Sequence, residues 1–284
     1  MKITRSMQIG IIGGKGRTGA QFAMFFRKLG FHVAICDKRT RLRPRDLFAR
    51  CDIVLFAVPL QDSTRIMKKE VVHTTRRDQL IVDVSSLKTA QVEAMLGARG
   101  EVIGMHPMFG PKTQALGETV ILTPGRCKRD TLRSLQTLLG KMGLKTVVMT
   151  PGEHDQLMTF VQALPHLKSL LIAGALQTLG ADLGMMDKVT PPPYELELNM
   201  VGRFLDDNPL LYGPIIFGNP RSLEVIKTLQ TLLGEYAKIC EQQDYTRFRS
   251  LYHELQRSFS SRRTALARTR SEACIRTLAH LRRR

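Results

Sequence analysis

The segment from residue 7 to residue 38, MQIGIIGGKGRTGAQFAMFFRKLGFHVAICDK, constrains the fold of this chain more than any other. An apolar run at 9–12 leads into a glycine-rich turn, and a helical pattern of apolar residues and a second apolar run follow. This order predicts a strand, a tight turn, a helix and a second strand. Gly14, Gly16 and Gly19 have the spacing in which the first glycine makes the turn, the second admits a pyrophosphate and the third lets the helix pack closely on the strand.

These glycines predict a dinucleotide-binding site instead of a purely structural turn, because the strand, the helix, the spacing and a following acid all agree. The phosphates would meet amide groups at the positive end of the helix. Asp37 lies about twenty residues on, where a carboxylate accepts hydrogen bonds from a ribose 2′-hydroxyl and repels a 2′-phosphate. We therefore predict NAD in preference to NADP, although the cations at 38, 39 and 41 could attract a phosphate. The predicted cofactor-binding residues are Gly14, Gly16, Arg17, Thr18, Gly19 and Asp37.

Alternating strand and helix patterns continue to about residue 150, which predicts an N-terminal Rossmann-type doubly wound parallel sheet with right-handed crossovers. Beyond that point the apolar residues recur at helical spacing. We therefore predict an α/β fold with a dinucleotide-binding domain at 1–150 and an all-helical substrate and dimerisation domain at 151–284. Long apolar stripes of this kind are buried within a domain or against a partner subunit, so we expect a homodimer.

The chain is long enough, at 284 residues with 43% hydrophobic content, for two globular domains. It has no run of eighteen apolar residues, and the first strand begins within a few residues of Met1. We therefore expect no membrane span, no signal peptide and a cytoplasmic location. The five cysteines have neither metal-binding nor redox spacing, which predicts reduced, structural thiols and no metal site.

Half of the net charge of +18 lies in the last segment, where residues 246–284 contain eleven arginines and two acidic residues. Such a segment could bind nucleic acid without specificity. No recognition motif or set of stacking aromatic residues accompanies the charge, so we interpret it as a solvated, arginine-rich helix face and expect no specific nucleic-acid partner. A cationic surface also suits a small polyanionic substrate, because it steers the substrate toward the protein.

Ligands of an open parallel sheet bind at the carboxyl ends of its strands, where the strand order reverses. Ser85, Ser86 and Lys88 follow one predicted strand, and His106 follows the next. Prolines and glycines flank His106, which predicts a fixed loop after the strand. A neutral imidazole there could accept the proton of a substrate hydroxyl while a hydride leaves the same carbon. His106 is therefore the predicted catalytic base, and a structural histidine is the alternative.

Four separated segments carry a family resemblance. They are DVSSLK at 83–88, IGMHPMFGP at 103–111, EHDQLMTFVQALPH at 153–166 and YELELNMVGR at 194–203. Together they resemble the dehydrogenase portion of the prephenate dehydrogenase family, most closely its enterobacterial branch, and the resemblance covers about residues 7–262. Members of that branch usually carry a fused chorismate mutase domain. Since this chain starts directly at the dehydrogenase portion, we expect it to lack the mutase.

The resemblance implies an oxidative decarboxylation in aromatic amino acid biosynthesis. Hydride passes from the ring carbon bearing the hydroxyl to NAD, carbon dioxide leaves, and the ring becomes aromatic. His106 matches the family histidine that hydrogen-bonds the ring hydroxyl, and Ser86 matches a serine close to that histidine and the nicotinamide. Lys88 matches a lysine near the active site, and Arg203 matches the arginine that holds a substrate carboxylate. We therefore predict Ser86 and Lys88 as catalytic residues together with His106.

Gln162 and His166 match a segment that lines the substrate pocket, and the resemblance links the histidine to feedback by tyrosine. Enterobacterial relatives commonly have arginines where this chain has Pro165 and Glu195. An anion beside a dianionic substrate weakens its binding unless the anion points to solvent or forms a salt bridge, whereas it could favour a substrate with an amino group. Glu195 is therefore a fourth predicted substrate-binding residue, with Arg203, His166 and Gln162.

Prephenate is the leading predicted substrate, and 4-amino-4-deoxyprephenate and arogenate are the alternatives. The freestanding form fits the branch that converts the amino analogue to 4-aminophenylpyruvate in antibiotic-type pathways. Two other classes stay open. One is another two-domain dehydrogenase or imine reductase with a helical dimerisation domain, and the other is a non-catalytic, NAD-responsive protein that binds nucleic acid through its basic tail.

Overall fold

The computed structural model describes residues 1–71, 75–110 and 116–281. The described chain divides into two compact units. Unit 1 comprises Met1–Gln162 and Leu210–Pro220, and unit 2 comprises Ala163–Pro209 and Arg221–Arg284. Unit 1 therefore includes two segments, 151–162 and 210–220, that the sequence patterns place in the helical domain.

Seven strands of the described residues form one sheet in unit 1, in the order β2-β1-β3-β4-β5-β6-β7. The strands are β1 (Gln8–Ile12), β2 (His32–Cys36), β3 (Ile53–Phe56), β4 (Leu80–Asp83), β5 (Glu101–Pro107), β6 (Thr119–Arg126) and β7 (Lys145–Val148). Neighbouring strands are parallel except β5 and β6. The chain passes from β1 to β2 on one side and then to β3 on the other, so the strand order reverses at β1. The predicted Rossmann-type fold is thus confirmed.

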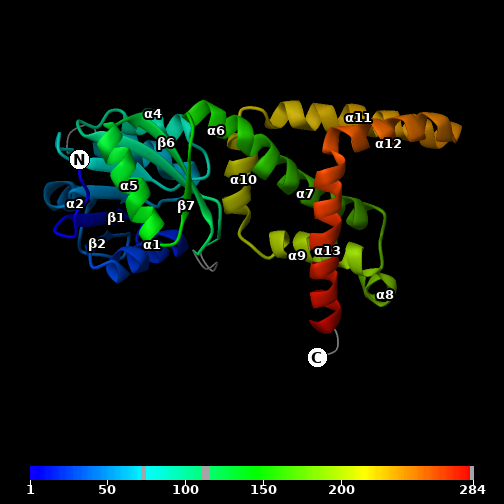
Figure 1. Ribbon diagram of the computed structural model, residues 1–284, viewed down its shortest axis with the longest axis horizontal. Helices are drawn as coiled ribbons and strands as arrows, with labels where there is room; N and C mark the ends of the chain where they lie inside the picture. The colour runs from blue at the N-terminus through cyan, green and yellow to red at the C-terminus, as the bar shows by residue number, and fades with distance from the viewer. Residues whose placement is uncertain (72–74, 111–115, 282–284) are drawn as a thin grey trace. The chain divides into compact units, whose positions relative to one another are not determined.

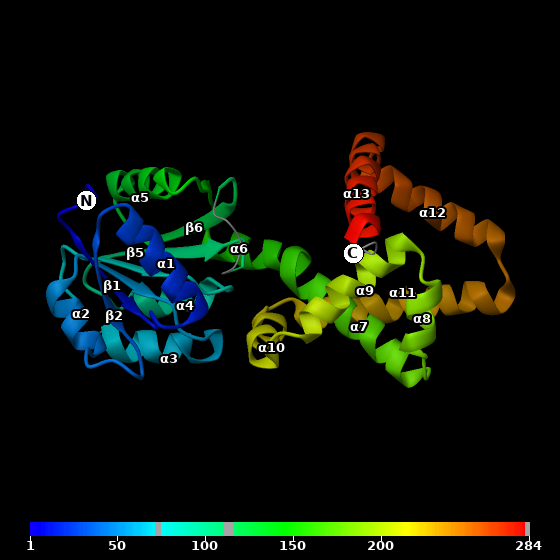
Figure 2. The same cartoon turned by 90° about the horizontal axis from the view of Figure 1, so that it is seen from below.

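Helices cover both faces of this sheet (Figure 1, Figure 2). One face carries α1 (Arg17–Lys28) and α5 (Arg129–Lys141), and the other carries α2 (Pro44–Arg50), α3 (Leu60–Val71) and α4 (Thr89–Met95). Successive residues of a strand point to opposite faces. Ile11 of β1 therefore joins the core that contains Phe22 of α1, whereas Ile12 joins the core that contains Phe48 of α2.

The antiparallel pair of β5 and β6 departs from the all-parallel sheet that the alternation of strands and helices predicts. The two strands are separated by the eleven residues 108–118. A parallel crossover needs a dozen residues or more, and usually a helix. The short connection therefore makes β6 run back beside β5, and this pairing carries β5 through Pro107.

The remaining described helices begin after β7. They are α6 (Pro151–Met158), the π-helical turn η1 (Thr159–Ala163), α7 (Leu164–Thr178), α8 (Leu183–Val189), α9 (Pro192–Leu205), α10 (Pro209–Gly218), α11 (Ser222–Gln242), α12 (Tyr245–Phe259) and α13 (Ser261–Leu281). α6 begins at Pro151 because Thr150 and Glu153 form a capping box. In unit 2, α9 packs against α7 and α13, and α12 contacts α11 and α13 (Figure 1). The predicted helical second part is therefore confirmed.

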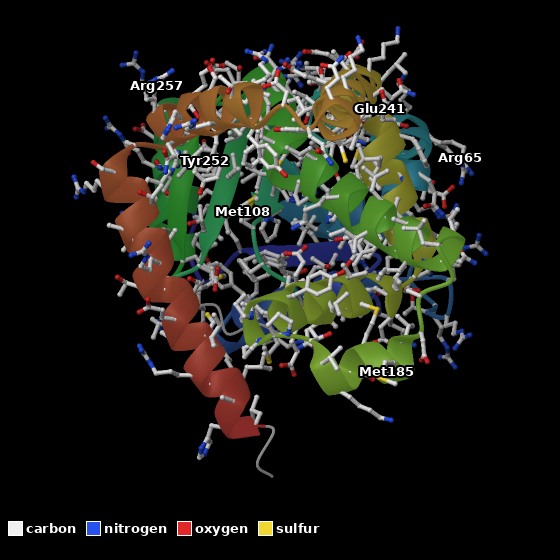
Figure 3. The ribbon with its side chains drawn as sticks, turned by 90° about the vertical axis from the view of Figure 1, so that its right-hand side faces the viewer. Arg65, Met108, Met185, Glu241, Tyr252 and Arg257 are labelled. Carbon is white, nitrogen blue, oxygen red and sulfur yellow. The ribbon has the colours of Figure 1, made fainter. Side chains whose placement is uncertain are left out.

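Large apolar side chains of unit 2 are exposed in the single chain. On α11 and α12 they include Leu233, Tyr236, Phe248, Tyr252 and Phe259, of which Tyr252 is labelled in Figure 3. Exposed apolar surface of this extent marks an interaction site. Within the described residues α13 buries none of its arginine-rich surface, as the interpretation of a solvated helix face requires. The arginines at 282–284 lie outside the described residues.

Among the described residues, the helical stretch Pro151–Thr178 is long and apolar enough to cross a membrane by length and composition, with a mean hydropathy of 1.2. Core helices of folded domains pass the same test. The first turns of this stretch contain the buried side chains of His154 and Asp155, which hydrogen-bond to residues at the strand ends of unit 1. This part of the stretch therefore belongs to the folded unit.

Candidate active site

The glycine-rich turn joins β1 to α1 through closely packed backbone. Gly13 has the left-handed backbone, with φ of +83°, and a Cβ there would lie 2.3 Å from the carbonyl oxygen of Ala57. The left-handed residue of the turn is thus Gly13, directly before the three glycines of the predicted pattern. A Cβ on Gly14 would instead lie 2.6 Å from Cγ2 of Ile35. A Cβ on Gly19 would lie 2.4 Å from the oxygen of Gly13, which is the close helix packing predicted for it.

Gly16 borders a more open space at the start of α1. The atoms nearest to a Cβ there would be the carbonyl oxygens of Gly13 at 3.2 Å and Ala57 at 3.9 Å. Gly16 is the N-cap of the helix and brings no side-chain acceptor, and the first turn, with Arg17 and Thr18, contains no acidic residue. The amides and dipole at this helix end therefore suit an anionic group such as a pyrophosphate.

Asp37 follows β2 directly and lies against the glycine-rich turn. Its Oδ2 accepts a hydrogen bond from the amide of Lys15 at 3.0 Å, and its Oδ1 accepts one from the amide of Lys38 at 2.8 Å. The structure thus brings the two predicted parts of the cofactor site together. An open glycine cradle beside a half-buried carboxylate fits a dinucleotide with an unmodified ribose 2′-hydroxyl.

Replacing Gly13 with alanine should lower the free energy of unfolding by at least about 1–2 kcal/mol, because a left-handed backbone is strained for any residue with a Cβ and the carbonyl of Ala57 leaves no room. Gly140→Ala in α5 is the matched control, since nothing lies within 4 Å of a Cβ there. That change should stabilise the helix by up to about 1 kcal/mol. Chemical denaturation measures both, and equal effects would contradict the assignment.

The sequence predicts that His106 lies in a loop after the strand. In the structure it lies within β5, near the end of the strand. The strand continues past His106 because its backbone pairs with Ile121 of β6. The His106 side chain is 3% exposed. Its Nδ1 lies 2.9 Å from Nε2 of His154, and its Nε2 lies 3.3 Å from Nε2 of Gln162. The predicted residues His106 and Gln162 are therefore in contact.

His154 and Asp155 of α6 extend this series of contacts. Nδ1 of His154 lies 2.8 Å from Oδ1 of Asp155. The Asp155 carboxylate also accepts hydrogen bonds from the amides of Lys88 at 2.8 Å and Thr89 at 2.9 Å. The side-chain amide of Asn219 donates to the main-chain oxygen of Asp155 at 2.9 Å. The carboxylate of Asp155, the imidazoles of His154 and His106 and the side-chain amide of Gln162 thus form one series of hydrogen-bonded groups.

Sequence patterns did not identify His154 or Asp155 as site residues, although both lie in the segment EHDQ that carries the family resemblance. One signal was available. His154 and Gln162 are eight residues apart, about two helical turns, so both lie on roughly the same face of the helix. Polar residues that share one face of a helix can meet in a buried polar contact.

The three ionisable groups of this series have shifted pKa values. Burial lowers the pKa of His106 well below its usual 6.5, and His154 and Lys88 lower it further. Burial also lowers the pKa of His154, although its hydrogen bond to Asp155 opposes the shift. Burial alone would raise the pKa of Asp155, but hydrogen bonds led by that from His154 outweigh it, and this pKa is lowered. Both imidazoles are therefore neutral and Asp155 is ionised at neutral pH.

These shifts should make the fold less stable in acid. In the unfolded chain His106 and His154 take up protons near pH 6.5, whereas in the folded chain their pKa values are lower. Below that pH the unfolded state binds more protons, so the free energy of unfolding decreases as the pH falls toward the folded pKa values. Denaturation between about pH 8 and pH 5 measures this decrease. His106→Asn should reduce it, and an unchanged pH dependence in that variant would contradict the role of His106.

Lys88 forms a buried ion pair at the ends of β4 and β5. Its side chain is 0% exposed, and Nζ lies 2.6 Å from Oδ2 of Asp83 and donates to the carbonyl oxygen of Met105 at 2.7 Å. Burial lowers the pKa of Lys88, and Asp83 opposes that shift. Ser85 also hydrogen-bonds to Asp83, whereas the predicted Ser86 is half-buried at the same strand end. The ammonium of Lys88 is therefore engaged with protein groups.

The other three predicted residues, His166, Glu195 and Arg203, lie in unit 2 on the packed helices α7 and α9. The ring of His166 stacks on that of Phe204 with 5.5 Å between the centroids, and burial lowers the pKa of His166. Arg203 is exposed in the last turn of α9, and Glu195 is half-buried in its first turn. The glycine-rich turn, Asp37, Ser86, Lys88, His106 and Gln162 all belong to unit 1.

A glycine-rich turn at the point of strand reversal, followed by an acid after β2, defines a nucleotide-binding protein with a Rossmann-type fold. The family model for the nucleotide-binding domain of prephenate dehydrogenase matches residues 24–148, and the model for its dimerization domain matches residues 150–254. The chain therefore belongs to the prephenate dehydrogenase family. The family resemblance predicted from the four segments is confirmed, and the glycine-rich turn lies before the matched residues.

Two curated relatives extend over most of the chain. A protein of Methanocaldococcus jannaschii, described as a probable arogenate/prephenate dehydrogenase, is 31% identical over 276 residues, which cover 90% of this chain and 62% of that protein. The T-protein of Enterobacter agglomerans is 29% identical over 250 residues, which cover 88% of this chain and 66% of that protein. The chain thus spans slightly less than two thirds of the length of these relatives.

Among solved structures, prephenate dehydrogenase from A. aeolicus in complex with hydroxyphenyl propionate and NAD+ has a similar fold. The TM-score is 0.70 at 18% identity, and the match covers 88% of this chain and 96% of that chain. At this identity the likeness shows a shared fold.

Proposed function

We propose that the chain catalyses the NAD-dependent oxidative decarboxylation of a prephenate-type cyclohexadienyl acid, with prephenate as substrate and 4-hydroxyphenylpyruvate as product. The family models over both parts of the chain support the reaction class. The observation that carries the proposal is the buried, neutral imidazole of His106 at the end of β5, within a segment that resembles the family.

His106 is the proposed proton acceptor. Its Nε2 takes the proton of the ring hydroxyl as the ring carbon loses hydride, which leaves a ring ketone. Loss of carbon dioxide converts this ketone to a phenolate, and the protonated His106 returns the proton to give the phenol of the product. NAD, when bound, supplies the hydride acceptor. Release of carbon dioxide makes the ring aromatic, which drives the reaction forward. The lowered pKa of His106 supports this role, because the imidazole is in its accepting form at neutral pH.

The other site residues bind and orient. Arg203 is the proposed partner of a substrate carboxylate, for which a planar guanidinium provides two parallel hydrogen bonds. Gln162 and His166 are proposed substrate-binding residues, and Ser86 is proposed to act beside the nicotinamide. The turn that contains Gly14, Gly16, Arg17, Thr18 and Gly19 would hold the pyrophosphate. We assign Lys88 to the support of the strand ends, because its ammonium is buried against Asp83 and Met105.

Glu195 favours a second candidate substrate class. Its carboxylate is half-buried in the first turn of α9, at a position where the resemblance leads us to expect a cation. A carboxylate there would attract a substrate that carries an ammonium group, as 4-amino-4-deoxyprephenate and arogenate do. The relatives and the reaction class do not distinguish these acids from prephenate, so the assay must compare all three.

The test supplies the purified chain with NAD and each acid in turn and records NADH and carbon dioxide. Prephenate should be turned over with kcat on the order of 1–10³ s⁻¹, the range of ordinary enzymes, and with the highest kcat/KM of the three. If the chain turns over only 4-amino-4-deoxyprephenate or only arogenate, that acid replaces prephenate as the proposed substrate. NADH formation without carbon dioxide, or no turnover of any of the three, would contradict the reaction class.

Asp37→Ser should change the cofactor preference. The substitution removes charge-assisted hydrogen bonds to the ribose, worth about 1.5–3 kcal/mol, and removes the repulsion of a 2′-phosphate. We expect kcat/KM with NAD to fall about ten- to a hundred-fold and kcat/KM with NADP to rise, helped by the cations at 38, 39 and 41. An unchanged ratio of the two values would show that Asp37 does not contact the ribose.

We further propose a cytoplasmic homodimer, with no specific nucleic-acid partner. The family model for the second part of the chain is that of a dimerization domain, and the apolar side chains exposed on α11 and α12 suit such an interface.

A further inference from the structure

The contacts around His154 allow one consistent arrangement of hydrogens. The Asp155 carboxylate accepts hydrogen bonds from the amides of Lys88 at 2.8 Å and Thr89 at 2.9 Å. An ionised carboxylate can only accept. Nδ1 of His154, which lies 2.8 Å from Oδ1 of Asp155, must therefore carry a hydrogen.

The hydrogen on His154 determines the hydrogen on His106. A neutral imidazole carries one hydrogen, so Nε2 of His154 has a lone pair. Nδ1 of His106 lies 2.9 Å from that atom and must donate to it. Nε2 of His106 then has the lone pair, and the amide nitrogen of Gln162 donates to it at 3.3 Å. In the opposite tautomers, a bare ring nitrogen of His154 would face the carboxylate of Asp155.

Burial raises the free-energy cost of the opposite tautomers. His154 and His106 are 0% and 3% exposed, so water does not compete for their ring nitrogens. An unpaired polar group in such a place costs about 1–3 kcal/mol. The other charged groups that face the two rings, Lys88 and Asp83, form an ion pair with each other.

We propose that His154 and Asp155 are positioning residues that hold His106 as the Nδ1–H tautomer, with its lone pair on Nε2. The catalytic consequence rests on the proposed function, in which the substrate hydroxyl takes the place of the Gln162 amide and Nε2 accepts the substrate proton. Neither positioning residue contacts the substrate. They act by setting which nitrogen of His106 can accept, and the direction in which it points.

The start of α6 is built to keep this pair in place. The capping box of Thr150 and Glu153 defines the first turn, and the side-chain amide of Asn219 donates to the main-chain oxygen of Asp155 at 2.9 Å. The hydroxyl of Thr159 donates to the side-chain oxygen of Asn219 at 3.2 Å. The backbone that carries His154 and Asp155 is therefore held independently of the two imidazoles.

The first test is ¹⁵N NMR of the imidazoles in the full chain without ligand. We expect His106 to be a single Nδ1–H tautomer and His154 also to be a single Nδ1–H tautomer. The exposed His32 of β2 gives the reference for an imidazole that exchanges between tautomers. An Nε2–H tautomer of His106, or an even mixture, overturns the proposal. Because no substrate is present, failure of the proposed function would appear only in the turnover assay.

The second test compares His154→Gln with His154→Phe. The glutamine oxygen can accept from Nδ1 of His106, whereas phenylalanine keeps the shape of the ring but has no acceptor. We expect the Gln variant to keep the His106 tautomer and a kcat within about ten-fold of wild type. The Phe variant should lose the single tautomer and lower kcat by at least about ten-fold, and by up to about 10⁴-fold, the loss known for a wrong histidine tautomer in a hydrolase, with little change in KM.

A packing role for His154 predicts the reverse order, because the Phe ring fills the site better than Gln. A Phe variant that is more active than the Gln variant therefore overturns the proposal. Asp155→Leu tests the carboxylate in the same way. In this variant the Nε2–H tautomer should appear in the rings of both His154 and His106. Unchanged tautomers in Asp155→Leu would remove Asp155 from the positioning pair.

Discussion

His106→Asn should lower kcat for prephenate by about 10²–10⁴-fold, the contribution of a well-placed general base. The asparagine amide nitrogen can take the place of Nδ1 and still donate to Nε2 of His154, so the fold around β5 should persist. What is lost is the lone pair at Nε2. KM should change little, because Arg203 is the proposed anchor of the substrate carboxylate. Steady-state kinetics with prephenate and NAD measure both parameters.

The control for this variant is His253→Asn, since His253 lies on the exposed surface of α12 and bonds to Gln256 at 2.9 Å. It should leave kcat unchanged. A His106→Asn enzyme that oxidises prephenate within a few-fold of the wild-type rate would disprove the role of a proton acceptor. With 4-amino-4-deoxyprephenate the loss should be smaller, because a neutral amine can use its own lone pair as hydride leaves.

Lys88→Met should lower the free energy of unfolding by about 3–5 kcal/mol, the cost of breaking a buried ion pair by removing one partner. Asp83 would keep a charge in a fully buried site, and the carbonyl oxygen of Met105 would lose its donor. Replacing both partners leaves no unpaired charge, so the double variant Lys88→Met with Asp83→Asn should be more stable than the single variant. Urea denaturation compares them.

An exposed ion pair is the control. Lys168→Met breaks the contact between Lys168 and Glu197, which are partly exposed and 2.9 Å apart. Such a pair contributes less than about 1 kcal/mol. If Lys88→Met costs no more than Lys168→Met yet abolishes turnover, then Lys88 acts on the substrate and our assignment to the support of the strand ends is wrong.

Local sequence patterns were sufficient for the architecture. Strand and helix periods, the glycine spacing and the position of Asp37 depend on residues close in the chain, and each agrees with the structure. Two features of the structure do not follow from these patterns. The spacing pattern does not include Gly13, which has the left-handed backbone of the turn. The connection at 108–118 is too short for a parallel crossover, which the alternation of elements does not reveal.

The surroundings of the candidate residues could not be predicted in the same way. His106 and His154 are 48 residues apart and meet because α6 returns to the end of β5. Lys88 matches a family lysine, but its burial against Asp83 follows from how two strand ends pack. The segment 210–220 returns to unit 1 and supplies Asn219, and no local period in the sequence indicates that return.

The sequence by itself determined the order of strands and helices, the nucleotide-binding turn and the residue types that could do the chemistry, because these depend on periodicity and spacing within one element. Only the tertiary structure decided which nitrogen of His106 can accept a proton. That choice depends on hydrogen bonds among β5, α6 and the amides after β4, and burial makes each of those hydrogen bonds obligatory.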